Sequence, residues 1–207
     1  MEKLSTDRIN EYLNFGNLSQ PFIEKSVLEN MVQQEKQNMI KAGKSPNIIK
    51  CLMKIVNDNI RYSSDQSIQC QKFGRTVKEI WESKLSSGCT DTATVFASIA
   101  RVFGIPTTIL HTAQFEWLEN LKNRNNKGVQ GHTFCECFYE NEWVLADVVA
   151  RRITQNYDPN KIVLDYDLGQ SHTFVAYYRG LDLGQKMTTK EHNKIMEEEC
   201  LKMIYSS

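Results

Sequence analysis

Residues 88–106, with the sequence GCTDTATVFASIARVFGIP, decide the fold expected for this chain. After Cys89 the apolar residues recur at spacings of one, three and four, the pattern of a helix with one apolar face. Gly104 and Pro106 are typical of the end of a helix. Glycine suits the C′ position, and proline cannot continue the backbone hydrogen bonds of the helix. Cys89 therefore stands at a helix N-terminus, where unpaired N–H groups and the helix dipole favour a thiolate. It is a candidate nucleophile, although most free cysteines are buried structural residues.

The composition is that of an ordinary globular chain. Of its 207 residues, 41% are apolar and 24% are charged, and 25 acidic residues balance 25 basic ones. This fits a soluble domain with a proper core, without a net charge that would attract nucleic acid or a membrane surface. The sequence has no apolar run of about eighteen residues and no apolar signal core near its start. We therefore expect a cytoplasmic protein with neither a nucleic-acid nor a membrane partner, and with free thiols.

Helical patterns fill the first half of the chain. Pro21 and Pro46 are each expected at the first position of a helix. The second of these helices runs to about Ile60 with one strongly apolar face. A short helix over residues 76–84 is expected to begin with a capping box, in which Thr76 is the N-cap and Glu79 the reciprocal partner.

Strand patterns fill the second half. Alternating and β-branched segments predict strands over residues 107–112, 132–139, 143–149, 162–165 and 173–178. A short helix is expected over residues 115–121, a mobile polar loop over 122–131 and a closing helix from about Lys190. Helices followed by mainly antiparallel strands indicate an α+β domain. The predicted division is an N-terminal helical extension (1–45), a core (46–185) and a C-terminal helix (186–207).

A cysteine nucleophile needs a base, and the base needs a third group to orient it. His132 opens the first strand after the polar loop. A tight hairpin would pair Asp147 with Phe134 or with His132 itself, which makes the histidine and the aspartate neighbours on one face. Asp147 stands among apolar residues, an unfavourable place for a carboxylate without a partner. Cys89, His132 and Asp147 are therefore the candidate nucleophile, base and orienting group.

Other titratable residues have simpler interpretations. A zinc site of His132, Cys135 and Cys137 is an alternative, but alternation sends both cysteines to the face opposite the histidine and no second pair completes a tetrahedral set. No metal is therefore expected. Asp91 is expected to complement the helix dipole. The remaining histidines, His111, His172 and His192, are expected at the surface or as satisfied core residues. His172 could also line a cleft.

Three blocks carry a resemblance to a known family. They are Gly-Cys-x-Asp-x-Ala at 88–93 followed by Ala-x-x-x-Gly-Ile-Pro at 100–106, Gly-His-x-Phe at 131–134, and Trp-Val-Leu-Ala-Asp at 143–147. In this order they resemble the transglutaminase-like core of the papain-like superfamily, especially its bacterial and archaeal members. The resemblance implies a nucleophile at the N-terminus of a central helix packed on an antiparallel sheet, with a triad of Cys89, His132 and Asp147.

The implied activity is cysteine-dependent acyl transfer on a peptide or carboxamide, as in a peptidase, amidase or transglutaminase. A thioester would pass to water or to an amine, with no cofactor and with a protein or peptide as substrate. The oxyanion donors would be the Cys89 backbone N–H and one further group. The candidates for that group are Tyr62, Trp81 and Gln71.

Two other functions are compatible with such a fold. A catalytically idle domain would act as a protein- or peptide-binding module, and a thiol of ordinary reactivity would favour it. An arylamine acyltransferase or a peptide:N-glycanase-type enzyme would use the same triad. The latter generally carries zinc-binding cysteine pairs, which this sequence lacks.

Overall fold

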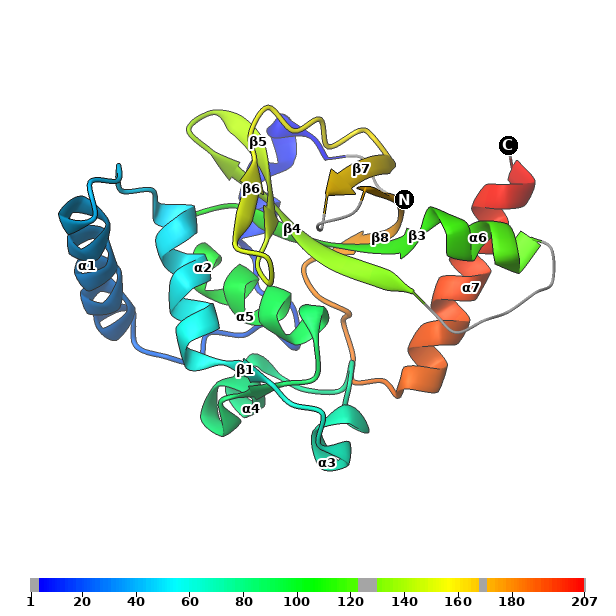
Figure 1. Cartoon of the computed structure of the whole chain (residues 1–207), viewed down its shortest axis with the longest axis horizontal. Helices are drawn as coiled ribbons and strands as arrows, with labels where there is room; N and C mark the ends of the chain where they lie inside the picture. The colour runs from blue at the N-terminus through cyan, green and yellow to red at the C-terminus, as the bar shows by residue number, and fades with distance from the viewer. Residues whose placement is uncertain (1–3, 123–129, 168–170, 207) are drawn as a thin grey trace.

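The computed structural model describes residues 4–122, 130–167 and 171–206. Helices and strands alternate along the chain as an α+β fold (Figure 1). In order they are η1 (Thr6–Leu13), α1 (Lys25–Lys41), α2 (Ile48–Asn59), β1 (Arg61–Tyr62), α3 (Gln66–Gln69), α4 (Val77–Ser83), β2 (Leu85–Ser86), α5 (Cys89–Val102), β3 (Thr107–Gln114), α6 (Phe115–Lys122), β4 (Gly131–Tyr139), β5 (Glu142–Asp147), β6 (Arg152–Thr154), β7 (Val163–Asp167), β8 (Ser171–Gly180) and α7 (Thr189–Ser206).

The main sheet is antiparallel and has the strand order β6-β5-β4-β3-β8-β7. The hairpin of β4 and β5 turns through Glu140 and Asn141, whose φ angles of 53° and 64° fit a two-residue turn. The hairpin register sets Cys135 opposite Ala146. This confirms the expected tight hairpin and carries the end of β5 towards the start of β4.

Helix α5 lies at the centre of the fold. Twelve of its residues, from Thr90 to Arg101, are buried, so the helix is covered on all sides. It packs against α2, α4, β3 and β4, and its apolar side chains share one core with Cys135 and Cys137. The arrangement places the N-terminus of α5, with Cys89, beside the first residues of β4.

The opposite face of the sheet and its far end are covered by the termini of the described chain. Tyr12 of η1 packs edge-on against Trp143, and both join Phe134 in a second apolar cluster. Helices α6 and α7 pack together against β8, where Met196 and Cys200 of α7 are buried (Figure 1). Cys200 therefore lies in a different core from Cys135 and Cys137.

Two predicted helix starts were wrong, the first by four residues and the second by two. Helix α1 begins at Lys25 rather than at Pro21. The reason lies upstream, because the N–H groups of Leu18 and Ser19 donate to Asp182 at 2.7 and 2.8 Å and hold this segment away from helical geometry. Helix α2 begins at Ile48, capped by Asn47, whose side chain accepts from the Lys50 N–H at 3.0 Å.

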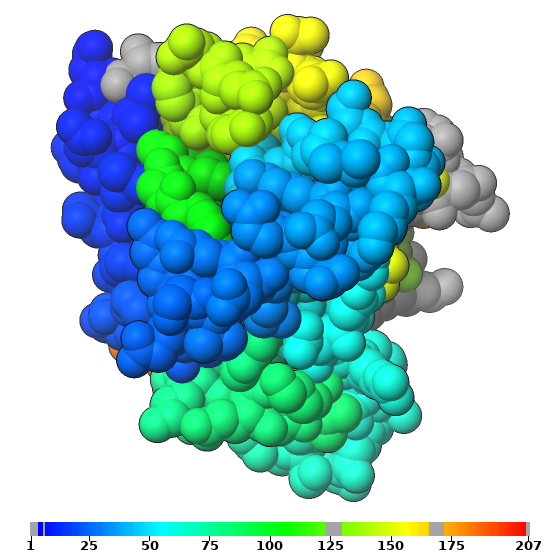
Figure 2. Space-filling model, turned by 90° about the vertical axis from the view of Figure 1, so that its left-hand side faces the viewer, coloured from blue at the N-terminus to red at the C-terminus, as the bar shows by residue number. Residues whose placement is uncertain are grey.

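Helices α1 and α2 form one outer surface of the molecule. Figure 2 shows α1 and the loop that follows it (blue) between the β4–β5 turn (yellow-green) above and residues 60–85 (cyan to green) below. In the described ranges, no helix is both long and apolar enough to span a bilayer. The structure does not test the division of the chain at residues 45 and 185, which stays a prediction. Most of the predicted loop over 122–131 lies outside the described residues.

Candidate active site

Cys89 is the first residue of α5. The preceding Gly88 has φ 154° and ψ −159°, a conformation that is open essentially only to glycine. The glycine therefore permits the abrupt turn from β2 into the helix that leaves the cysteine at the helix end. There the first backbone N–H groups and the positive end of the dipole stabilise a negative charge on the thiol.

His132 and Asp147 are brought together at the ends of β4 and β5. Nε2 of His132 lies 2.9 Å from Oδ2 of Asp147, whose side chain is completely buried. The N–H direction is not aligned for a good hydrogen bond, so the contact is a close ion pair. Oδ1 of Asp147 accepts from the N–H of Ala150 at 3.0 Å. Because Asp147 occupies Nε2, the Nδ1 side of the ring is left for Cys89, with which His132 is in hydrogen-bonding contact.

The electrostatics of the pair favour charge separation. Burial raises the pKa of the Cys89 thiol, but the hydrogen bond and charge of His132 outweigh it, so the pKa falls below its ordinary value. Burial lowers the pKa of His132, whereas the contacts with Asp147 and Cys89 raise it more, and the net shift is upward. Both shifts favour the proton on the imidazole over the proton on the thiol, which is the direction of a thiolate–imidazolium pair.

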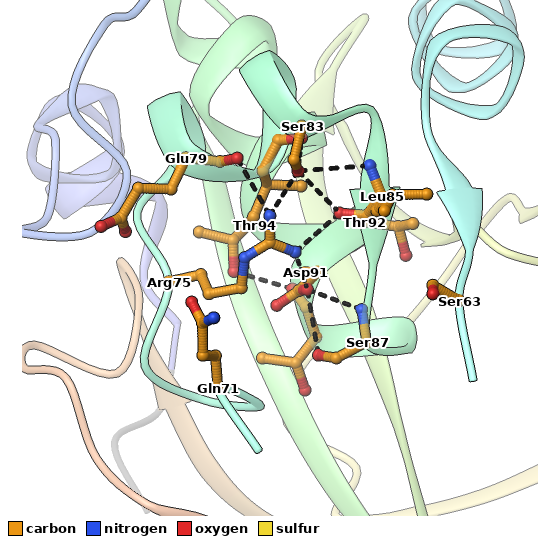
Figure 3. Close-up of polar contacts among 12 residues, drawn as sticks. Ser63, Gln71, Arg75, Glu79, Ser83, Leu85, Ser87, Asp91, Thr92 and Thr94 are labelled. Carbon is orange, nitrogen blue, oxygen red and sulfur yellow. Dashed lines mark hydrogen bonds and ion pairs between the residues drawn. The ribbon is translucent and has the colours of Figure 1, made fainter. Parts of the chain in front are cut away.

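A buried ion pair supports the turn that carries Cys89 (Figure 3). Asp91 accepts from the backbone N–H and the hydroxyl of Ser87 at 2.8 and 3.0 Å, and it lies 3.3 Å from Nη1 of Arg75. Arg75 also donates to the carbonyl oxygens of Leu85 and Glu79 at 2.7 and 2.9 Å. Asp91 does lie in the first turn, as expected, but its main role is to tie the residues before Cys89 to the loop that begins α4.

Two cavities meet at Cys89 and His132. One, of about 210 Å³, extends towards α7 and is lined by Tyr177 and His192 among others. The other, of about 250 Å³, extends towards β1 and β2 and is lined by Tyr62. Cys89 and His132 therefore lie where the two cavities meet.

The three oxyanion candidates lie in different places. Tyr62 is 68% exposed and lines the β1-side cavity together with Cys89. Trp81 packs against Phe22, with ring centroids 5.2 Å apart, and lines neither of these two cavities. Nε2 of Gln71 donates to the carbonyl of Ser67 at 2.8 Å, so its amide is already engaged. Of the three, Tyr62 alone shares a described cavity with the thiol.

Several residues near the thiol were not singled out from the sequence. Thr133 lies next to Cys89, with 3.6 Å between Oγ1 and Sγ. Strand alternation could have indicated it, because it shares the α5-facing side of β4 with Cys135 and Cys137. His111 and His192, expected at the surface or as satisfied core residues, instead line the α7-side cavity. No local signal marks them, since they come from β3 and α7.

The structure also places the residues of the alternative zinc site and the remaining histidine, His172. Cys135 and Cys137 are buried in the α5 core, on the side of β4 away from the ring of His132 and its neighbour Phe134. Nδ1 of His172 is hydrogen-bonded to Nε2 of Gln114 at 2.9 Å. Among the described residues, no group of three or more histidine, cysteine or acidic side chains has the geometry of a metal site.

Comparison with known proteins defines the family. Residues 30–148, more than half of the 207, match the sequence model of the transglutaminase-like superfamily. The chain therefore belongs to that superfamily, as its three sequence blocks indicated. No curated protein matches the sequence significantly.

One solved structure shares the fold. A provisionally assigned cysteine protease from Cytophaga hutchinsonii is similar with a TM-score of 0.50 and 15% identity, over 89% of this chain and 50% of that one. LapG from Legionella pneumophila is similar over 88% of this chain and 100% of its own, with 16% identity and a TM-score of 0.41. This chain thus spans half the length of the first protein, and the likeness to that protein, at 15% identity, concerns the fold alone.

Proposed function

We propose that this protein is a cysteine-dependent hydrolase or acyltransferase that acts on peptide or carboxamide bonds through a thioester. The observation that carries the proposal is the contact of Cys89 with His132 at the junction of two cavities, with the shifts of both pKa values that favour the ion pair. A buried structural cysteine needs neither a basic partner nor access to a cavity.

The thiolate of Cys89 attacks the carbonyl carbon, and the C–S bond forms as the carbonyl electrons move to oxygen. When the tetrahedral intermediate collapses, the C–N bond breaks and the His132 imidazolium gives its proton to the leaving amine. Water or an acceptor amine then attacks the thioester while neutral His132 takes the proton. The thiolate leaves, and the ion pair of Cys89 and His132 is restored.

Asp147 and the oxyanion donors complete the proposed machinery. Asp147 holds the imidazole with Nδ1 towards the thiol and stabilises its positive charge. The backbone N–H of Cys89, free at the helix start, supplies one donor to the developing oxyanion. Tyr62 supplies the second from the β1-side cavity. The substrate is a protein or peptide, since a cavity on each side of the thiol suits a chain that continues in both directions.

The test is the pH dependence of Cys89 alkylation by iodoacetamide. A Cys70→Ser background removes the exposed thiol, and mass spectrometry identifies the modified residue. We expect a midpoint near pH 7 that rises above pH 8.5 in His132→Ala, because the stabilising imidazolium is lost. His172→Ala, which changes a histidine outside both cavities, is the matched control. A midpoint near 9 that ignores His132→Ala would refute the proposal and favour the idle binding module.

A further inference from the structure

Thr133 follows His132 on β4, and both residues contact the sulfur of Cys89. His132 is in hydrogen-bonding contact with the thiol, and Oγ1 of Thr133 lies 3.6 Å from Sγ. Successive side chains of a strand point to opposite faces, so the two residues reach the sulfur from different directions. The sulfur of Cys89 therefore has two neighbours on β4 that can donate a hydrogen to it.

The side chain of Thr133 is held in place and shielded from solvent. It is only 3% exposed, and its branched β-carbon restricts the rotation of the side chain. In the register of β3 and β4 it stands opposite His111, whose Nδ1 lies 3.4 Å from Oγ1. Oγ1 of Thr90, the second residue of α5, lies 3.1 Å away. The hydroxyl is therefore held between α5, β3 and β4, next to the sulfur.

The hydroxyl of Thr133 has one hydrogen and three polar neighbours. A Cys89 thiolate carries a full charge, and hydrogen bonds to an ionised acceptor are about twice as strong as those between neutral groups. Thr90 has a hydrogen of its own to give to Oγ1 of Thr133, whereas a thiolate has none. The thiolate is therefore the acceptor that the hydrogen of Thr133 favours over Thr90 and over the neutral ring of His111.

We propose that Thr133 is a catalytic residue whose hydroxyl donates a hydrogen bond to the thiolate of Cys89 and stabilises this sulfur before it attacks and when it leaves. The proposal rests on the proposed function, because it requires a thiolate as the acceptor. His132 takes and gives the proton of the reaction. Thr133 transfers no proton and acts only on the charge of the sulfur.

The hydrogen bond is strong only while the sulfur is charged. When Sγ of Cys89 bonds to the carbonyl carbon it becomes a neutral sulfur, which is a weak acceptor. When water or an amine attacks the thioester, the C–S bond breaks and the charge returns to Sγ. A donor that lowers the pKa of a thiol makes it a weaker nucleophile and a better leaving group. Thr133 therefore makes more thiolate available at neutral pH and speeds its departure from the thioester.

Titratable and charged groups from several other elements face Cys89. They come from β1, β3, β8, α7 and the segment after α3: Tyr62, His111, Tyr177, His192 and Lys72. Burial lowers the pKa values of His111 and His192 to about 3 and about 4, so both rings are neutral above pH 5. Burial raises the pKa of Tyr177, and the charge of Lys72 lowers the pKa of Cys89. Between pH 5 and 9 the protonation of His111, His192 and Tyr177 therefore does not change.

The test is the pH dependence of Cys89 alkylation by iodoacetamide in the wild type and in Thr133→Val, both in the Cys70→Ser background. Valine keeps the shape of threonine and replaces the hydroxyl with a methyl group. We expect the midpoint to rise by about one pH unit, the size of a hydrogen bond to a charged group. The rate should fall about threefold at pH 5 and rise about threefold at the high-pH plateau, because a thiolate of higher pKa is more nucleophilic.

Two control variants separate this effect from a general disturbance of the site. Thr133→Ser keeps the hydroxyl and should restore the wild-type profile. Thr107→Val changes another buried threonine, on β3, whose hydroxyl lies 3.7 Å from the sulfur of Cys137, and should leave the profile of Cys89 unchanged. An unchanged midpoint in folded Thr133→Val would overturn the proposal, and so would a midpoint in Thr133→Ser that moves as far as in Thr133→Val.

A double variant separates a direct effect on the sulfur from one that acts through His132. In the His132→Ala background, with rates measured up to pH 11, Thr133→Val should still raise the midpoint by about one pH unit, because the hydroxyl contacts Sγ itself. Loss of the shift in that background would mean that Thr133 only positions the ring of His132, and the proposal would be wrong.

A measurement on the wild type covers the case in which Thr133→Val does not fold. The buried hydroxyl proton of Thr133 should move downfield in proton NMR as the pH rises through the midpoint of Cys89, because its acceptor gains a charge. A hydroxyl proton that does not follow this midpoint would overturn the proposal.

Failure of the proposed function would look different. A wild-type midpoint near 7 that rises in His132→Ala but not in Thr133→Val would overturn the role of Thr133 alone. A wild-type midpoint near 9 that ignores His132→Ala would overturn the enzyme. In that case a still higher midpoint in Thr133→Val would show that the hydroxyl stabilises the thiolate of a protein without an activated thiol, and equal midpoints would overturn both proposals.

Discussion

The carboxylate of Asp147 lies 2.9 Å from Nε2 of His132 and has no exposed surface. A carboxylate in this position is stabilised by the positive charge that it induces on the ring, and it accepts a second contact from the Ala150 N–H. The pair therefore couples the protonation of His132 to an anion that solvent does not reach. Because the imidazolium of His132 lowers the pKa of Cys89, that pKa depends in turn on the contact between His132 and Asp147.

Asp147→Asn is expected to keep the shape and remove the charge. The pKa of His132 should fall, and the pKa of Cys89 should rise from about 7 towards 9, because the imidazolium that stabilises the thiolate becomes less populated. Any Cys89-dependent turnover should fall by about 100-fold or more. Alkylation rates between pH 5 and 10 measure the shift. An unchanged midpoint in a folded Asp147→Asn protein would show that the aspartate is only structural.

The buried pair of Arg75 and Asp91 supports a stability prediction. Asp91→Ala removes the carboxylate partner of the Arg75 guanidinium, which is almost fully buried. This change should lower the free energy of unfolding by about 3–5 kcal/mol. The double variant Arg75→Met with Asp91→Ala should lose less than the sum of the two single changes, because the groups interact directly. Urea unfolding gives all three values.

The exposed pair of Lys78 and Glu82 is the control for that series, since both side chains are more than half exposed. Glu82→Ala should change the free energy of unfolding by less than about 1 kcal/mol. Comparable losses for Glu82→Ala and Asp91→Ala would mean that burial does not determine the contribution of the Arg75–Asp91 pair.

Much of the fold was predictable because its signals are local. The capping box of Thr76 and Glu79 is present as expected. Gly104 has the positive φ, 71°, that its place after α5 required. The short turn between β4 and β5 fixes their register, and that register brings Asp147 to His132. These relationships join residues that are close in sequence or related by one tight hairpin.

The rest depends on contacts between distant segments. The true start of α1 follows from Asp182, more than 160 positions away, and no local pattern at Pro21 reveals it. The α7-side wall of the site exists because β8 pairs with β3 and carries α7 with it. Pairing across such separations is determined by packing of the whole chain, so His111 and His192 could not be assigned to the site from their neighbours in sequence.

Gly131 offers a test of how closely β4 must approach β3 next to His132. A Cβ at this position would lie 2.4 Å from the carbonyl oxygen of Thr112, so Gly131→Ala must push the strands apart. We expect the pKa of Cys89 to rise and the alkylation rate at pH 7 to fall several-fold, because the ring of His132 moves with its backbone. Gln130→Ala, at an exposed neighbour, should leave the rate unchanged. A normal rate in Gly131→Ala would show that the strand end adapts without moving the ring.

The buried histidines of the α7-side cavity predict a specific loss of stability in acid. Burial lowers the pKa of His192 to about 4, whereas the unfolded chain takes up this proton at about 6.5. The unfolded state therefore binds more protons below pH 6.5, and stability falls with pH until about pH 4, by up to about 1.4 kcal/mol per pH unit. His192→Phe lacks this proton, so its stability relative to the wild type should improve steadily over that range. Urea unfolding at pH 7, 6 and 5 measures the difference, and Met196→Leu, in the same cavity without a titratable group, should show a difference that is constant. A constant difference for His192→Phe as well would mean that the ring is protonated in the folded protein.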